Sequence, residues 1–260
     1  MRIATWNINS LKMRLPRIEE FLGYADVDVL CLQETKTADK SFPALAFSTL
    51  GYEAVHHSQG QWNGVAILSR VGIDDPSHGF GPDVADPYEG DARVLAAMCG
   101  GIRFISVYVP NGREVGTDFY ERKLHWLSTM DEWITNQYSP TDPLVVCGDF
   151  NVAPDDRDVW DPKAFVGSTH VTEPERKAIT RLQEWGFEDT FRRVYPEQDR
   201  LYTYWDYRAG DFHQHRGMRI DHVLATRPVA ERVTWAVVDR NARKGSGPSD
   251  HAPLIVDLRD

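Results

Sequence analysis

Cysteine is scarce in this chain, with three residues among 260. Cys31, Cys99 and Cys147 each lie in or beside an apolar run typical of a buried strand, and an odd number cannot all pair in disulfides. The sequence therefore predicts reduced thiols in the core and a reducing, cytoplasmic compartment. It does not favour the disulfide framework of a secreted digestive nuclease.

Long hydrophobic runs are also missing. No stretch approaches the roughly 18 uncharged apolar residues that a membrane span needs, and the N-terminus enters a strand-like run without a basic and then apolar leader. We therefore expect a soluble, unexported protein with no membrane partner. Because 42% of the residues are hydrophobic and 11% aromatic, the chain can bury one large core. We expect a single domain over 1–260 and a monomer.

An excess of basic residues is the third absence, since Lys and Arg number 29 against 39 Asp and Glu, for a net charge of −10. Taken alone, this balance argues against a nucleic-acid partner. The charge is unevenly spread, however, and one segment interleaves basic and aromatic residues, namely Arg192, Arg193, Arg200, Tyr202, Tyr204, Trp205, Tyr207, Arg208, Phe212, Arg216 and Arg219. Such interleaving is typical of a nucleic-acid groove, and a solvated loop over a local core is the alternative.

The chain does contain five short polar clusters, each at one end of an apolar, β-branched run. They are Trp6-Asn7, Gln33-Glu34, Gly148-Asp149-Phe150-Asn151, Asp221 and Ser249-Asp250-His251. Buried strands of a sheet bring their ends to one edge, so residues far apart in sequence can converge there. Each cluster alone is more often a turn or a helix cap, but the five together favour a site.

The polar members of these clusters are carboxylates, carboxamides and one histidine. Oxygen ligands with one imidazole suit Mg²⁺ or Mn²⁺, whereas sets rich in Cys or His would indicate zinc, copper or iron. The sequence therefore predicts a hard cation, with Mg²⁺ first and Mn²⁺ as the alternative, and a phosphate ester as substrate.

Strand-like and helix-like segments alternate along the whole chain. We expect helices over about 15–24, over 119–138 and after the capping box Thr172-Glu173-Pro174-Glu175. Two strand-like runs, Arg93–Met98 and Ile102–Val109, are joined by a Gly-Gly hairpin signal, which predicts a mixed sheet. Two stretches without periodicity, 72–91 and 209–217, are expected to be loops at the rim of the site.

Seven motifs in this order resemble those of the exonuclease III family of abasic-site endonucleases, within the endonuclease/exonuclease/phosphatase superfamily. They are Trp6-Asn7-Ile8-Asn9, Leu32-Gln33-Glu34-Thr35-Lys36, Tyr108-Val109-Pro110-Asn111-Gly112, Gly148-Asp149-Phe150-Asn151, Trp205-Asp206-Tyr207-Arg208, Arg219-Ile220-Asp221 and Ser249-Asp250-His251. The resemblance runs from residue 2 to about 258 and implies a four-layered α/β sandwich, with two mixed β-sheets face to face and helices outside. It also implies cleavage of double-stranded DNA 5′ to abasic sites and trimming of blocked 3′ ends.

The resemblance assigns roles to the polar clusters. Its implied Mg²⁺ site has Glu34 as the principal ligand, with Asn7 and Asp250 nearby. Asp149, Asn151 and His251, at the centre where water attacks, belong to the same implied set of metal-binding residues. Asp149 would hold and deprotonate that water, and His251, paired with Asp221, would stabilise the charged phosphate. Tyr108 and Asn111 would contact the phosphate. Sequence alone leaves open whether Asp149 or His251 is the general base, how many metal ions bind, and what His222 does.

The same resemblance implies DNA contacts by Tyr204, Trp205, Arg208, Arg216, Met218 and Ile220, of which Tyr204, Met218 and Ile220 would enclose a sugar that has lost its base. Two other classes of function stay open. Another metal-dependent phosphodiesterase or phosphatase of the superfamily would share the polar residues but lack the basic and aromatic segment. A catalytically inactive DNA-binding module would keep the fold and lose polar residues of the site.

Overall fold

The computed structural model describes residues 1–260 and contains two six-stranded mixed sheets. In strand order, the first sheet consists of β11 (Val233–Val238), β12 (Leu254–Leu258), β1 (Arg2–Asn7), β2 (Val29–Gln33), β4 (Trp62–Ser69) and β3 (Glu53–Gln59). The second consists of β5 (Asp74–His78), β6 (Val94–Cys99), β7 (Ile102–Tyr108), β8 (Leu144–Asp149), β10 (Asp221–Thr226) and β9 (Phe187–Asp189).

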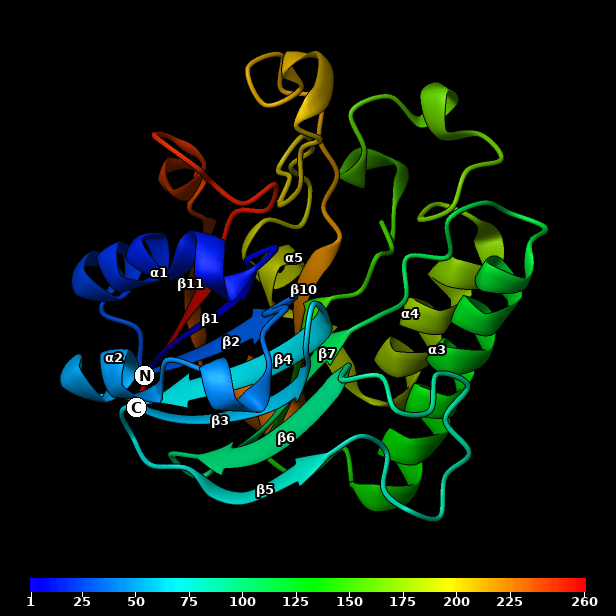
Figure 1. Ribbon diagram of the computed structural model, residues 1–260. Coiled ribbons are helices and arrows are strands. Elements are labelled where there is room, and N and C mark those ends of the chain that lie inside the picture. Colours follow the sequence, from blue (N-terminus) through cyan, green and yellow to red (C-terminus); the bar gives the residue numbers. More distant parts are fainter.

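Helices cover the two outer faces of the sheet pair (Figure 1). The α-helices are α1 (Leu11–Ala25), α2 (Ala44–Thr49), α3 (Asp118–Gln137), α4 (Glu173–Trp185), α5 (Thr190–Val194) and α6 (Arg227–Ala230). Short 3₁₀ helices are η1 (Asp39–Ser41), η2 (Asp156–Asp158), η3 (Pro162–Phe165), η4 (Arg208–Gly210) and η5 (Arg240–Arg243). None of the helices combines the length and apolar character that crossing a membrane requires.

Alternation along the central strands builds four layers. In β8, Val145 and Cys147 point into the core between the two sheets, whereas Leu144 and Val146 pack against α3 and α4. The outer face of the first sheet packs in the same way against α1 and α2. Because both faces are covered, the central strands are continuous apolar runs, as expected for buried sheets. The predicted four-layered sandwich is confirmed.

Strand direction brings the polar clusters to one edge. In the parallel pair β1 and β2, Asn7 lies opposite Gln33, and in the parallel pair β7 and β8, Tyr108 lies opposite Asp149. β10 runs antiparallel to β8, so its first residue, Asp221, lies opposite the last residue of β8. Strand ends that are far apart in sequence therefore meet, and the loops at the top of Figure 1 rise above this edge.

Local expectations were mostly met, with two corrections. The hairpin of β6 and β7, helix α3 and the capping box of α4 all form. The first helix begins at Leu11 and not near 15, so Pro16 lies inside the helix and not in its first turn. The 72–91 stretch is not entirely irregular, because Asp74–His78 forms an edge strand with β6.

A buried ion cluster supports the loops below the site. Arg219, with 1% of its side chain exposed, donates to Asp158 at 2.7 Å and to Asp189 at 2.7 Å, and Arg192 also pairs with Asp158. Burial opposes ionisation of Asp158, but Arg219 and Arg192 outweigh it and lower its pKa to about 2. Charges this deeply buried are stable only when paired.

This cluster predicts a loss of stability in acid. The pKa of Asp158 is lower in the folded chain than its ordinary value of 3.8, so its stabilising effect is complete above pH 4 and disappears between about pH 4 and 2. The effect amounts to about 2 kcal/mol. Urea unfolding of the native protein should therefore depend more steeply on pH in this window than unfolding of Asp158→Asn. Identical slopes would contradict the assignment.

Candidate active site

Asn7 joins two of the predicted ligands. Its side-chain nitrogen donates to Glu34 at 2.7 Å and to Asp149 at 2.9 Å, so the two carboxylates share one amide. Asn7 is fully buried and Asp149 nearly so. The ends of β1, β2 and β8 thus place three oxygen-bearing side chains within a few ångströms.

Crowding of negative charge marks this corner of the site. Burial, together with the charges of Asp221 and Glu34, raises the pKa of Asp149 to about 7, against the opposing effects of His251 and Asn7. Burial also opposes ionisation of Glu34, but Lys36 and the Asn7 amide outweigh it and lower its pKa. A divalent cation would relieve this crowding, and the donors are oxygens, so the residues fit Mg²⁺ or Mn²⁺.

His251 and Asp221 form a buried pair at the opposite side of Asp149. The His251 Nδ1 lies 2.7 Å from an Asp221 carboxylate oxygen, and Nε2 points toward Asp149 at 3.8 Å. Burial alone would lower the pKa of His251, but Asp221 and Asp149 outweigh it and raise the pKa to about 10. The ring is therefore protonated at neutral pH and presents Nε2–H to the centre of the site.

Asn151 and Asn111 form the wall beyond Asp149. The Asn151 backbone N–H donates to Asp149 at 2.9 Å, and its side-chain oxygen accepts from the Asn111 amide at 3.3 Å. Asn151 adopts a left-handed backbone with φ of 50°, which its neighbours must stabilise. Tyr108 lies beside Glu34 and Asp149, and its burial raises the pKa of the phenol well above the usual value.

Asp250 lies near the rim of the same site. Its carboxylate accepts from the Asn9 amide at 3.1 Å, and Asn9 in turn accepts from Lys36 at 2.7 Å. Lys36 also pairs with Glu34 at 2.6 Å. One hydrogen-bonded chain therefore connects Asp250 to Glu34, although the two residues lie 216 positions apart in the sequence.

One group is compact enough to hold a metal ion by itself. Ligand atoms of Asp149, Asp221 and His251 all lie within 4.8 Å of one another. A protonated imidazole has no lone pair to give to a metal. His251 can therefore either carry a positive charge beside Asp221 or bind a metal as a neutral ring, but it cannot do both at once. The sequence predicts both roles for this residue, and at neutral pH its raised pKa favours the charged ring.

Tyr204 stands over the histidine, where the sequence predicted a pocket wall. Its ring centre lies 4.9 Å from that of His251. Met218 and Ile220 are buried in a small apolar cluster with Val159, and Tyr204 packs against its edge. Val159 of this cluster also lines a neighbouring hollow.

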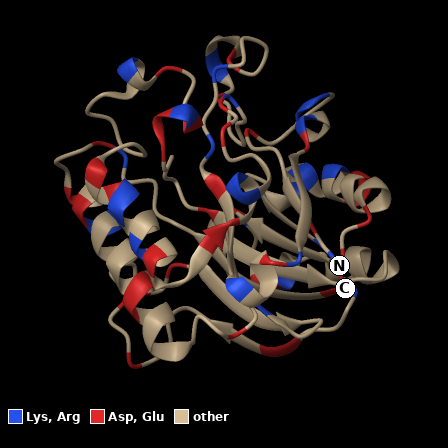
Figure 2. Cartoon of the chain, turned by 180° about the vertical axis from the view of Figure 1, so that it is seen from behind, with Lys and Arg blue, Asp and Glu red and all other residues tan.

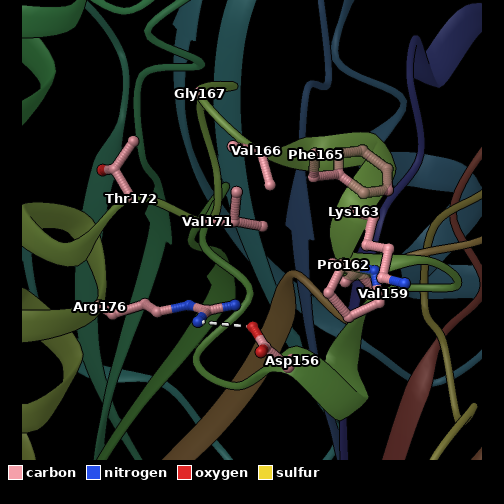
Figure 3. Close-up of a pocket in the computed structure, with 10 residues that line it drawn as sticks. All are labelled: Asp156, Val159, Pro162, Lys163, Phe165, Val166, Gly167, Val171, Thr172 and Arg176. Carbon is pink, nitrogen blue, oxygen red and sulfur yellow. Dashed lines mark ion pairs between the residues drawn. The ribbon is translucent and has the colours of Figure 1, made fainter.

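That hollow measures about 340 Å³ and is lined by residues of the 156–176 segment. Figure 3 shows Val159, Phe165 and Val171 lining it, with the ion pair of Arg176 and Asp156 at 2.8 Å across one end. None of the predicted catalytic residues lines this hollow.

Two expectations about DNA contacts need correction. Trp205 is completely buried, with a solvent-exposed fraction of 0%, because its indole packs against Tyr202 and Phe212. It therefore supports the loop and cannot stack on a base. Arg192 and Arg219, two arginines of the basic and aromatic segment, are both engaged with buried carboxylates and are therefore not free to bind phosphate.

Arg208 and Arg216 remain accessible. The Arg208 side chain is 87% exposed and pairs with Asp206, while Arg216 pairs with Asp211 at 2.6 Å. Figure 2 shows basic and acidic residues side by side on these loops. Each arginine thus carries a carboxylate neighbour, which reduces the net positive charge that it presents.

Two histidines near the site, the buried His222 and the partly exposed His170, had no predicted role. His222 donates from Nε2 to the Val152 carbonyl at 2.8 Å and accepts from Arg219 at 3.1 Å, because an arginine can only donate. His170 lies 2.6 Å from the Asn151 carbonyl and contacts the Asn111 amide. Burial and Lys123 lower the pKa of His170 to about 4, so it is neutral. No local motif indicates these contacts.

Comparisons with known proteins agree with this geometry. The model of the Endonuclease/Exonuclease/phosphatase family matches residues 4–251, which include every predicted site residue. Exodeoxyribonuclease III of Haemophilus influenzae is 29% identical over 270 residues, covering 100% of both chains. An AP endonuclease from Archaeoglobus fulgidus is 34% identical with a TM-score of 0.95, covering 100% of both chains. A 3′ phosphatase from Neisseria, solved with a product DNA hairpin, is 35% identical with a TM-score of 0.94 and the same coverage.

Proposed function

Because this chain belongs to the endonuclease/exonuclease/phosphatase family, we propose that it is a DNA-repair hydrolase that cuts the phosphodiester 5′ to abasic sites and trims 3′ ends. The observation that carries the proposal is the contact of Asp149 with Asn7, Asn151 and the charged pair of His251 and Asp221 at one sheet edge. We also propose that it works as a monomer of one domain. A cytoplasmic location is supported by its three buried, free cysteines, which a reducing compartment keeps unpaired.

Hydrolysis of a phosphate ester needs an activated water, donors for the phosphate oxygens and a counterion for developing charge. Asp149, whose pKa is about 7, is poised to accept the proton of the water near neutral pH. Asn151 fixes Asp149 through its backbone N–H. Protonated His251 supplies a donor and a positive charge to the phosphate, and Tyr108 and Asn111 complete the donors on the other side.

Mg²⁺ would be held by the oxygens of Glu34, Asn7, Asp149, Asn151 and Asp250. When bound, it supplies positive charge that stabilises the phosphate and the leaving oxygen. The crowded carboxylates around Asp149 support such a cation, and Mn²⁺ meets the same donor set.

Glu34→Ala should raise the Mg²⁺ concentration needed for half-maximal activity by about 10-fold or more, with partial recovery of kcat as Mg²⁺ rises. The change removes an oxygen ligand but leaves Asp149 and His251 in place. A titration of initial rate against Mg²⁺ measures the shift. Glu20→Ala, on the exposed side of α1, is the control. An unchanged titration in Glu34→Ala would remove Glu34 from the ligand set.

DNA affinity should depend on salt through Arg208 and Arg216. Replacing both by Ala should make the slope of log K against log salt less steep, by an amount that corresponds to the loss of up to about two phosphate contacts. The change should be smaller if Asp206 and Asp211 keep the arginines engaged. Fluorescence anisotropy with duplex DNA measures the slope. The double variant Arg227→Ala/Arg232→Ala, in and beside α6, is the control, and equal slopes for both doubles would place the DNA surface elsewhere.

Removal of a 3′ phosphate is a second candidate activity. It is favoured by the likeness to the Neisseria 3′ phosphatase over the whole chain. The same donors would bind a terminal phosphate monoester, because a diester and a monoester present similar oxygens to His251 and Asn111.

Three duplexes separate these activities. One carries an internal abasic site, one a 3′ phosphate at a nick and one an unmodified recessed 3′ end, each assayed with Mg²⁺ and with excess EDTA. We expect metal-dependent cleavage of the first duplex. If only the second duplex reacts, the activity of the protein is removal of a 3′ phosphate and not incision at abasic sites. No activity on any of them, or full activity in EDTA, would contradict the proposed function.

A further inference from the structure

A fully buried lysine lies behind the wall of the active site. Lys123, on α3, has no exposed side-chain surface, and its Nζ donates to the backbone carbonyls of Asn151 at 2.7 Å and Asn111 at 3.3 Å. These residues belong to two different loops, which follow β8 and β7. One ammonium group therefore connects the backbones of two predicted site residues.

Glu175 balances this charge and connects a third segment. Its side chain is also fully buried, and the carboxylate accepts from Lys123, from Thr169 at 2.7 Å and from the His170 N–H at 2.9 Å. The second oxygen accepts from the Thr172 N–H at 3.0 Å, which closes the capping box of α4. Thr172 and the start of α4 appear at the left of Figure 3.

Close packing leaves the loop before α3 little freedom. A Cβ on Gly112, whose φ is +84°, would meet the Lys123 Cδ at 2.7 Å. The Thr169 hydroxyl oxygen also lies 3.1 Å from the Asn111 carbonyl. The stem and the head of Lys123 thus fix the backbone of this loop from two directions.

Helix capping alone does not explain the pair. A Glu at the third helical position caps α4 without any lysine, and a buried ion pair is often no more stabilising than apolar residues of similar volume. What the lysine adds is a bond to the carbonyl of Asn151, a residue held in a left-handed conformation beside Asp149.

We propose that Lys123 and Glu175 are positioning residues of the DNA-cleaving site, because their buried contacts fix the backbones of Asn111 and Asn151. The inference rests on the proposed function for its catalytic consequence. Its structural content, the fixing of both loops, can be tested without any substrate.

The chain offers a matched control. Arg181 and Asp131 also pair α4 with α3, at 3.1 Å, but contact none of the site loops. If the buried pair only holds the two helices together, replacing either pair should have the same kind of effect, namely a change in stability alone.

The main variant is the double substitution Lys123→Met/Glu175→Gln, which leaves no unpaired buried charge and keeps a residue that can cap α4. With a duplex that the native protein cleaves, we expect kcat to fall by about 10- to 100-fold at temperatures well below Tm, with KM changed by less than about 3-fold. Arg181→Met should leave both constants within about 2-fold of the native values. A kcat that matches the native value in folded protein would overturn the proposal.

A double-mutant cycle with Asn151→Ala tests whether the buried pair affects kcat through Asn151. If the pair acts through Asn151, adding Lys123→Met/Glu175→Gln to Asn151→Ala should lower kcat by much less than it does in the native background. Losses that multiply would show that the pair does not act through this residue.

Hydrogen–deuterium exchange supplies the readout that needs no activity. Amides of 109–114 and 150–154 should exchange faster in the double variant than in the native protein, while Arg181→Met should not change them. If these amides exchange at the native rate in the double variant, the proposal is overturned, whether or not the protein cleaves any substrate. An inactive native protein with faster exchange in the variant would instead contradict the proposed function alone. If the double variant does not fold, Glu175→Gln takes its place in each measurement.

Discussion

Asp149→Asn should lower kcat for cleavage of duplex DNA by about 10³-fold or more, while changing DNA affinity by less than about 3-fold. Asn keeps the size of the side chain and can still accept from the Asn151 N–H, but it cannot take a proton from water. The loss therefore falls on the transition state and not on binding. Single-turnover rates and anisotropy titrations measure the two effects separately.

Stability distinguishes this loss from misfolding. The pKa of Asp149 is raised to about 7, so its ionised form is disfavoured in the folded protein and its charge destabilises the fold above about pH 4. Asp149→Asn removes that charge, so Tm at pH 8 should be equal to or higher than that of the native protein. A lower Tm together with restored activity on cooling would assign Asp149 a structural role.

The convergence of the site could be predicted from the sequence because each part of it is local. Asn7, Glu34 and Asp149 each follow a run of apolar residues, and parallel strands end at the same edge. Asp221 opens an antiparallel strand, which brings a strand start to that edge. Strand type and direction were thus enough to bring these residues together, without knowledge of any side-chain contact.

The DNA surface could not be predicted as well, because exposure depends on packing between distant segments. Arg219 and Arg208 look alike in the sequence, within one basic and aromatic segment. Arg219 is buried because Asp158 and Asp189, 61 and 30 positions away, face it across the fold. No local pattern distinguishes a buried, paired arginine from one that is free to bind phosphate.

The supporting contacts were missed for the same reason. Glu175 was predicted as a helix cap, which it is, but its second role depends on Lys123 from another helix. His222 has a role only because Val152 and Arg219 lie on either side of its ring. Local spacing identifies residues that carry chemistry, whereas residues that hold them in place depend on long-range packing.

The pair of His251 and Asp221 gives the second large effect. His251→Ala should lower kcat by about 10²- to 10⁴-fold, because it removes the charged donor that faces Asp149. Asp221→Asn should cost less, since the ring remains. If Asp221 acts only through His251, the double variant should be no slower than His251→Ala alone. Losses that multiply in the double variant would mean that the two residues act independently.

The pH profile tests the same pair by a different property. Asp221 is the strongest contribution to raising the pKa of His251 to about 10, against burial, which lowers it. The native enzyme should therefore keep its ring protonated and stay active well above pH 8. Without the Asp221 carboxylate, Asp149 is the main group left to oppose burial, so the pKa of His251 should fall, and the activity of Asp221→Asn should decline at a lower pH than that of the native enzyme. Asp206→Asn, a carboxylate paired with Arg208 on the exposed loop, is the control and should keep the native profile. If the alkaline limb of Asp221→Asn coincides with that of the native enzyme, the charge on His251 does not depend on Asp221, and the stabilisation of the phosphate must come from another group.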